Sequence, residues 1–348
     1  MIYDVNGNAL QTENSERPNC KIIAHRGYHV DVAQNTIDAF IASANAGFNW
    51  IEIDIRRCSD GIYVLAHDAT VTLYNNGVAT SVNIPNSNYE SIKAYTWDSA
   101  GQYKLCTLQA VFNAMMIYDM NIICDLKNGT NADIMKLASM SGATDKVLLF
   151  YSSFQDAYND RELLLKYDNV PIRCTPTNYN EYLTLASAIS NPIYANVNAS
   201  ISERYQKYLN IALSCGIPIL FSGCTKNNYN IWCVLANGVM ANESLNITYN
   251  EFFDILNNNY NIATTITPNT NSISVSVNGS ISITASSNIS TAGGYVYGFI
   301  ENPVVATLTQ TVFGQNASFT VVGASSGNTV LHLFNGCGEI VNVSVSVS

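Results

Sequence analysis

The chain has 348 residues, of which 47% are hydrophobic, which is enough to bury one large α/β domain and a second, smaller one. Its 16 basic and 26 acidic residues give a net charge of −10, which argues against nonspecific binding to nucleic acid or to an anionic membrane. The 9 cysteines include no Cys-x-x-Cys pair and several lie in apolar runs, so we expect them to be mostly reduced.

Residues 1–20 are predicted to be an amino-terminal extension. They contain neither the basic start nor the hydrophobic stretch of a signal peptide. No run in the chain approaches the roughly 18 apolar residues of a membrane-spanning helix. The sequence therefore predicts no secretion signal and no membrane span.

Residues 21–260 alternate short β-rich runs with segments of helical period, which indicates a parallel sheet built from β-α units. About eight such units predict a (β/α)8 TIM barrel, with an open doubly wound sheet as the alternative. The strand candidates are "KIIAHRG", "WIEIDI", "YVLAHD", "NIICDLKN", "KVLLFYSS", "VPIRC", "IPILFSG" and "GVMANE", with "YANV" as a further one.

An insert at residues 69–106 directly follows one of these strand candidates and is too long for an ordinary loop. In a barrel we expect such an excursion to lie over the active face. Its tyrosines and Trp97 are interpreted in two ways, either as a surface that stacks on substrate or as side chains that pack the insert down.

The composition changes after about residue 262 to Ser, Thr, Val, Asn and Gly in strict alternation, as in "NSISVSVNGSISITAS". A period of two with Asn-Gly and Gly-Gly turns predicts a small antiparallel sandwich over residues 264–348, of the immunoglobulin-like kind. The segment resembles bacterial immunoglobulin-like modules that are appended to surface and virion proteins.

Acids, bases and cations gather where four predicted strands end, which is the face on which barrel enzymes carry their active sites. Residues two apart on a strand point to the same side, so Glu52 faces with Asp54, and Asp125 faces with Lys127. The four strand ends contribute His25 and Arg26, Glu52 and Asp54, His67 and Asp68, and Asp125 and Lys127.

These residue types predict hydrolysis of a phosphodiester. A divalent cation bound by Glu52, Asp54 and Asp125 would relieve their mutual repulsion, and an all-oxygen ligand set suits Ca²⁺ or Mg²⁺. His25 and His67 can exchange protons near neutral pH. The positive charges of Arg26 and Lys127 can hold an anionic substrate.

The order of "AHRG", "QNTIDAF", "WIEIDIRRCSDGIYVLAHD", "TLQAVF" and "NIICDLKN" strongly resembles the glycerophosphodiester phosphodiesterase family over about residues 21–245. The resemblance implies a barrel in which His25 and His67 are the acid–base pair. It further implies that Glu52, Asp54 and Asp125 bind the metal, and that Arg26 and Lys127 contact phosphate.

Several positions depart from the family pattern. Gln34 and Asp125 each stand where the family usually has Glu, which affects metal distance and preference. Phe221 replaces a common Trp, and Asn242 falls where a Thr-Asp pair is usual. His29 is predicted to be a rim residue without a catalytic role.

The predicted function is metal-dependent hydrolysis of a small glycerophosphodiester, or of a glycerol-phosphate polymer such as teichoic acid, to glycerol phosphate and an alcohol. The attacking oxygen comes from water or from the substrate's neighbouring hydroxyl. A phospholipase D-like barrel and a non-catalytic binding module on a surface or virion protein are the alternative functions. The sandwich favours a location outside the cytoplasm, on a cell surface or a phage tail. The alternative interpretation is a bacterial enzyme of lipid metabolism that scavenges glycerophosphodiesters. The sequence does not fix the oligomeric state.

Overall fold

The computed structural model describes residues 21–198, 208–212, 215–224, 236–241, 264–290, 294–335 and 339–348. The predicted extension at 1–20, the boundary near residue 262 and Asn242 lie outside these ranges. None of the described helices is long and apolar enough to cross a membrane.

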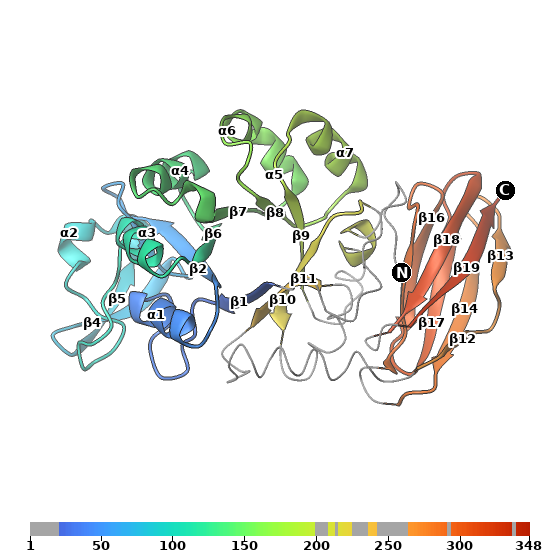
Figure 1. The fold of residues 1–348 in the computed structure, drawn as a ribbon, viewed down its shortest axis with the longest axis horizontal. Coiled ribbons are helices and arrows are strands. Elements are labelled where there is room, and N and C mark those ends of the chain that lie inside the picture. Colours follow the sequence, from blue (N-terminus) through green and yellow to red (C-terminus); the bar gives the residue numbers. More distant parts are fainter. Residues whose placement is uncertain are drawn as a thin grey trace.

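Eight described strands form a closed parallel barrel of the TIM type, because each pairs with two neighbours and the first, β1, pairs with both β2 and β11. The helices α1–α7 flank these strands and the insert, and residues 208–212 form a further helical segment (Figure 1). The barrel strands, in their order around the ring, are β1 (Lys21–His25), β2 (Trp50–Arg57), β6 (Asn121–Leu126), β7 (Val147–Tyr151), β8 (Ile172–Cys174), β9 (Ile193–Asn198), β10 (Ile219–Cys224) and β11 (Ala236–Ala241).

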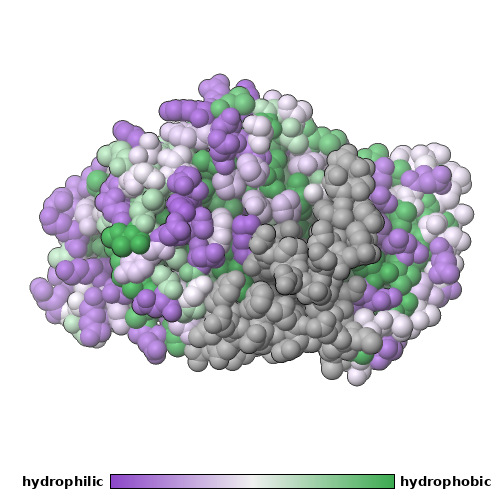
Figure 2. Space-filling view, viewed as in Figure 1, coloured by the Kyte–Doolittle hydropathy of each residue, from purple (hydrophilic) through white to green (hydrophobic). Residues whose placement is uncertain are grey.

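Four of the helices begin at a Ser or Thr whose side-chain oxygen accepts a hydrogen bond from the first turn, namely Thr36, Thr107, Thr130 and Ser153. Each of these hydrogen bonds fixes the residue at which the loop ends and the helix begins. Figure 2 shows hydrophilic side chains spread widely over the outer surface of the described helical part. The helices are α1 (Ile37–Asn45), α2 (Tyr89–Ile92), α3 (Leu108–Ile117), α4 (Asn131–Met140), α5 (Phe154–Asn159), α6 (Arg161–Lys166) and α7 (Tyr179–Ala188).

One predicted strand of the barrel is not part of the parallel ring. The run "YVLAHD" gives β3 (Tyr63–Leu65), which pairs antiparallel with β2 outside the ring. A tight turn joins the two strands, with the amide of Cys58 bonded to the carbonyl of Ile62 at 2.8 Å. Such a short turn can connect only antiparallel strands. The ring is completed instead by β9, from the "YANV" segment.

The insert at 69–106 shares one small apolar cluster with Cys58, Val64 and Ala66, which precede it. It contains the hairpin of β4 (Thr70–Asn75) and β5 (Val78–Asn83) and the short helix α2. Tyr89, Tyr95 and Trp97 pack against its apolar cluster, which favours the interpretation that they hold the insert down.

The carboxy-terminal part consists of two four-stranded sheets that pack face to face around an apolar core. The pairing of β13 with β19 is parallel and the other strand pairs within the two sheets are antiparallel. One sheet contains β12 (Ile266–Pro268), β14 (Ser280–Ser287), β17 (Asn316–Gly323) and β16 (Ala306–Val312), and the other contains β13 (Ser272–Val275), β19 (Ile340–Val347), β18 (Gly327–Phe334) and β15 (Tyr297–Ile300).

Strand β15 is buried along its whole length. Ile300 packs into the core between the two sheets, whereas Tyr297 and Phe299 belong to the same apolar cluster as the outer face of the barrel. The all-β part and the barrel therefore share a packed apolar surface.

The barrel interior has an apolar layer made by alternate residues of its strands, namely Ile23, Ile123, Leu148, Leu220 and Met240. The intervening strand residues, such as Ile22, Cys124 and Leu149, face outward into the main core. Five cysteines of the described chain, Cys58, Cys106, Cys124, Cys174 and Cys215, are buried and free, as predicted.

We predict that Leu148→Ala lowers the free energy of unfolding by about 2–5 kcal/mol, because Leu148 is fully buried in this layer and its loss leaves a cavity. The matched control is Leu165→Ala on α6, where the leucine is 55% exposed and the change should stay within about 0.5 kcal/mol. Urea unfolding followed by circular dichroism compares the two variants, and equal losses would contradict the assignment of Leu148 to the interior.

Candidate active site

Polar residues continue the interior face of the strands directly above the apolar layer. His25, Asp125 and Ser222 each lie two residues after a residue of that layer, so their side chains point into the barrel. Strand β2 contributes Glu52 and Asp54 by the same alternation. The side chains that face the interior therefore change from apolar to polar over two residues of each strand.

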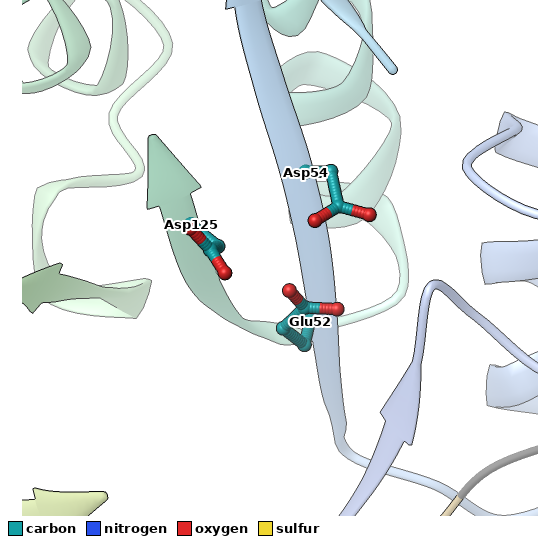
Figure 3. Close-up of side chains that lie close together, drawn as sticks. All are labelled: Glu52, Asp54 and Asp125. Carbon is teal, nitrogen blue, oxygen red and sulfur yellow. The ribbon is translucent and has the colours of Figure 1, made fainter. Parts of the chain in front are cut away.

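Three carboxylates meet inside the barrel. Glu52 and Asp54 project from β2, and Asp125 projects from the neighbouring strand β6 (Figure 3). One oxygen of each lies within 4.8 Å of the others. Glu52 is 2% exposed and Asp54 is 1% exposed. Holding three acids this close together, with two of them buried, requires positive charge nearby.

Two basic side chains supply part of that charge. The ammonium of Lys127 lies 3.0 Å from Asp54 and 2.8 Å from Asp125. The guanidinium Nε of Arg26 lies 2.9 Å from the other carboxylate oxygen of Asp54. Asp54 is therefore held between two cations, whereas Glu52 is 3.7 Å from the ring of His25.

The pKa values follow this arrangement. Burial, and then the charges of Asp54 and Asp125, raise the pKa of Glu52 well above its ordinary value. Burial also acts on Asp54, but Lys127, Asn35 and Arg26 outweigh it and lower the pKa of that carboxyl. Burial opposes the charge on Lys127, yet Asp125 and Asp54 raise its pKa overall. Lys127 and Arg173 lower the pKa of Glu52 but do not outweigh its burial and the two aspartates. A divalent cation among the three carboxylates would supply the missing positive charge.

A tight turn after β1 places His25 and Arg26. Arg26 and Gly27 both have positive φ, 58° and 82°, and the amide of Arg26 donates to the carbonyl of Glu52 at 3.0 Å. A Cβ on Gly27 would lie 2.8 Å from that of Ala39, so only glycine fits against α1. The turn therefore requires a glycine directly after His25 and Arg26.

Asn35, which the sequence analysis did not single out, links this turn to the acids. Its side chain donates to Asp54 at 2.9 Å and accepts from the Asp54 amide at 3.2 Å. Its own amide donates to the carbonyl of Arg26, and its φ is 55°. The "QNT" segment contained this residue, and its left-handed backbone is a conformation that asparagine tolerates.

His67 reaches the site by a different route from the one predicted. It does not follow the end of a parallel strand. The antiparallel strand β3 returns along β2, and the amide of Ala66 bonds the carbonyl of Asp54 at 3.1 Å. The carbonyl of His67 accepts two bonds from Arg56. Its ring Nδ1 lies 2.8 Å from the Oδ1 of Asp68.

All seven residues predicted for the site line one cavity of about 140 Å³: His25, Arg26, Glu52, Asp54, His67, Asp125 and Lys127. The cavity is also lined by Phe150, Arg173, Asn196, Ser222 and Met240, which sequence reasoning missed. The rule that polar residues at strand ends mark the active face would have found Arg173 in "VPIRC" and Asn196 in "YANV".

Other residues considered from the sequence lie elsewhere. His29 is outside the cavity lining and its Nδ1 lies 2.7 Å from the carbonyl of Gly27. Gln34 accepts a bond from Arg26 at 3.1 Å. Phe221 is fully buried in the outer core, so it does not form the floor of the cavity. No residue of the described insert at 69–106 lines the cavity.

The closed barrel with acids, histidines and cations at one end of its interior defines a phosphodiesterase-like enzyme site. Comparison with known families gives a match over residues 25–204, more than half of the 348, to the glycerophosphoryl diester phosphodiesterase family. The chain belongs to this family and is an enzyme of the glycerophosphodiester phosphodiesterase class.

Individual relatives are distant. A glycerophosphodiester phosphodiesterase of Caldanaerobacter subterraneus is 23% identical over 61% of this chain and 83% of its own length. The human glycerophosphodiester phosphodiesterase 1 is 26% identical, and the match spans 41% of this chain and 42% of the human protein. The likeness therefore covers most of the bacterial relative but less than half of the human one.

Solved structures show the same barrel fold. A glycerophosphodiester phosphodiesterase structure from Galdieria sulphuraria matches with a TM-score of 0.53 and 17% identity, over 68% of this chain and 98% of that one. A phosphodiesterase of Oleispira antarctica, solved with its product sn-glycerol-3-phosphate, matches with a TM-score of 0.51 and 17% identity, over 65% of this chain and 93% of that one.

We predict that Glu52→Gln stabilises the metal-free protein near neutral pH. Because folding raises the pKa of Glu52, the stability that comes from its proton is complete below the ordinary glutamate pKa and is lost as pH rises through the raised value. Glutamine stays neutral, so at about pH 7.5 the variant should melt at least about 2 °C above the wild type, with the difference vanishing near about pH 4.

The control for this measurement is Glu162→Gln on the exposed surface of α6, which should leave the pH profile of the melting temperature unchanged. Added Mg²⁺ or Ca²⁺ should stabilise the wild type and stabilise Glu52→Gln less, since the variant lacks one carboxylate ligand. A wild-type melting temperature that does not fall relative to Glu52→Gln as pH rises would contradict the prediction.

Proposed function

We propose that this protein hydrolyses glycerol phosphodiesters to glycerol phosphate and an alcohol, with a divalent cation and two histidines as acid and base. The observation that carries the proposal is that acids, cations and both histidines line a single small cavity in the barrel. Membership of the family supports the reaction class.

Glu52, Asp54 and Asp125 would hold the cation. Their all-oxygen donor set fits Mg²⁺ or Ca²⁺, and the raised pKa of Glu52 marks a buried carboxyl whose negative charge Lys127 and Arg173 offset only in part. When bound, such an ion supplies positive charge that polarises the phosphoryl group and stabilises negative charge in the transition state.

His25 and His67 come from different segments and both line the cavity. One removes a proton from the attacking oxygen and the other protonates the leaving alkoxide. The attacking oxygen belongs to water or to the substrate's own neighbouring hydroxyl. Detection of a cyclic glycerol phosphate early in the reaction distinguishes the second route from the first.

Arg26 and Lys127 contact the phosphoryl oxygens in this proposal. Each is paired with Asp54 on one side, but a guanidinium has five N–H donors and an ammonium has three, so both have donors to offer a ligand. Because the two cations are fixed by Asp54, the phosphate meets donors that need little reorganisation.

The carboxy-terminal sandwich is proposed to be immunoglobulin-like. The sheet orders β12-β14-β17-β16 and β15-β18-β19 correspond to the ABED and CFG arrangement of such domains, with β13 added beside β19. A module of this kind supports use on a cell surface or a virion, where a glycerol-phosphate polymer such as teichoic acid is an accessible diester.

We predict that His25→Ala and His67→Ala each lower kcat by about 10²–10⁴-fold, as expected for loss of a general acid or base. His29→Ala is the matched control and should stay within about threefold, because His29 lies outside the cavity lining. Steady-state hydrolysis of glycerophosphocholine, with melting curves for each variant, makes the comparison. Comparable losses at His29 and His67 would show that the second histidine is misassigned.

A further prediction distinguishes a glycerol-phosphate polymer from a small glycerophosphodiester as the substrate. Incubation of the protein with purified teichoic acid and with glycerophosphocholine should release glycerol phosphate from both if the polymer is a substrate. His25→Ala run in parallel controls for contaminating activity. Release from glycerophosphocholine alone rules out the polymer and leaves the small diester as the substrate.

A further inference from the structure

Arg56 connects the strand that carries two of the acids to the segment that carries His67. It lies on β2, two residues after Asp54, and is half-buried. Its guanidinium Nε donates to the carbonyl oxygen of His67 at 2.9 Å, and its Nη2 donates to the same oxygen at 2.6 Å. A side chain from the barrel wall thus reaches the backbone of a residue assigned to acid–base catalysis.

The two histidines of the site are held in different ways. His25 is the last residue of β1, and its backbone pairs with Glu52 of β2. His67 lies in the connection between β3 and β4, outside both strands. Strand pairing therefore fixes the first histidine, whereas the position of the second depends on the contacts of a short connection.

Arg56 is the contact that holds His67 against the barrel. Within the described residues, the hydrogen-bonding partners of His67 are Arg56 and Asp68. Asp68 is the next residue in the chain and its side chain is 74% exposed, so it cannot by itself fix His67 relative to the barrel. The amide of Ala66 bonds the carbonyl of Asp54, but this contact lies one residue earlier.

The geometry of arginine suits this contact. A guanidinium is planar and presents its N–H donors as a rigid fork, so two donors on one oxygen fix where that oxygen lies. Proton transfer requires the ring of a histidine within hydrogen-bonding distance of the reacting oxygen. A displacement of about 1 Å can lower the rate about 100-fold.

We propose that Arg56 is a positioning residue, which supports the reaction by holding the carbonyl of His67 so that its ring stays at the cavity. The inference rests on the proposed function, since it takes His67 as one of the two acid–base groups. It adds to that function a residue that lies outside the cavity lining. The competing roles are a purely structural one and direct binding of the substrate.

Kinetics of glycerophosphocholine hydrolysis at saturating Mg²⁺ or Ca²⁺ provide the first test. Arg56→Ala should lower kcat by about 10–100-fold and change KM by less than about threefold, and Arg56→Lys should lose less. The matched control is Arg57→Ala, because Arg57 is the next residue, is exposed, and bonds Asn128 through its backbone. This control should match the wild type in kcat, KM and melting temperature.

The double variant Arg56→Ala/His67→Ala tests whether Arg56 acts through His67. If it does, Arg56→Ala lowers kcat in the wild-type background but causes no further loss in the His67→Ala background. An equal loss in both backgrounds would overturn the inference in favour of a structural role. A raised KM at unchanged kcat in Arg56→Ala would overturn it in favour of direct substrate binding.

Nuclear magnetic resonance of the histidine rings gives a readout that does not need activity. The chain has 4 histidines, and His25→Ala and His67→Ala assign two of their signals in protein labelled with ¹³C-histidine. At a fixed pH, Arg56→Ala should shift or broaden the His67 signal and leave the His25 signal in place. Arg56→Lys, which keeps the positive charge, should shift it in part, and Arg57→Ala should move neither signal.

An unchanged His67 signal in folded Arg56→Ala would overturn the inference. If Arg56→Ala fails to fold, Arg56→Lys is used in the same comparisons. Wild-type activity in His67→Ala would instead refute the acid–base assignment in the proposed function, while the ring signals would still report whether Arg56 holds His67. The two failures therefore give different results.

Discussion

The clustering of three carboxylates at one end of the barrel interior, two of them buried, is the constraint on which the rest of the site depends. Acids this close and this far from water repel each other and lose hydration, which raises the pKa of Glu52. Lys127 and Arg26 offset that cost at Asp54, and Asn35 adds two hydrogen bonds to the same residue. The cations that would hold phosphate therefore also allow the acids to be buried.

The same constraint explains the backbone around β1 and β2. The turn after β1 has two successive residues of positive φ, which brings Arg26 back over Asp54. Gly27 permits the close approach of α1, and Asn35 closes the loop against the Arg26 carbonyl. The left-handed backbone of this turn thus places the cation that offsets the charge of Asp54.

The barrel also distributes the chemistry around its wall. The β1–β2 side carries His25, Arg26 and two acids, and the opposite side carries Arg173 and Asn196 on β8 and β9. The apolar layer beneath them separates this polar layer from the remainder of the interior. Because only alternate residues of each strand face the cavity, a small number of positions determines the net charge of the cavity lining.

The sequence by itself determined the β-α order of the barrel, the change to an alternating β pattern after residue 262, and the residues of the acid, histidine and cation set. These depend on local periodicity and on polar residues that interrupt apolar strands. The tertiary structure decided what depends on distant pairings. It placed β3 antiparallel to β2 and thereby brought His67 to Asp54, and it made β9 a barrel strand. It also packed Trp97 into the insert and brought Arg173 across the barrel to the same cavity as His25. Strand register and ring closure arise from contacts far apart in the chain, and local sequence patterns do not encode which distant strands will meet.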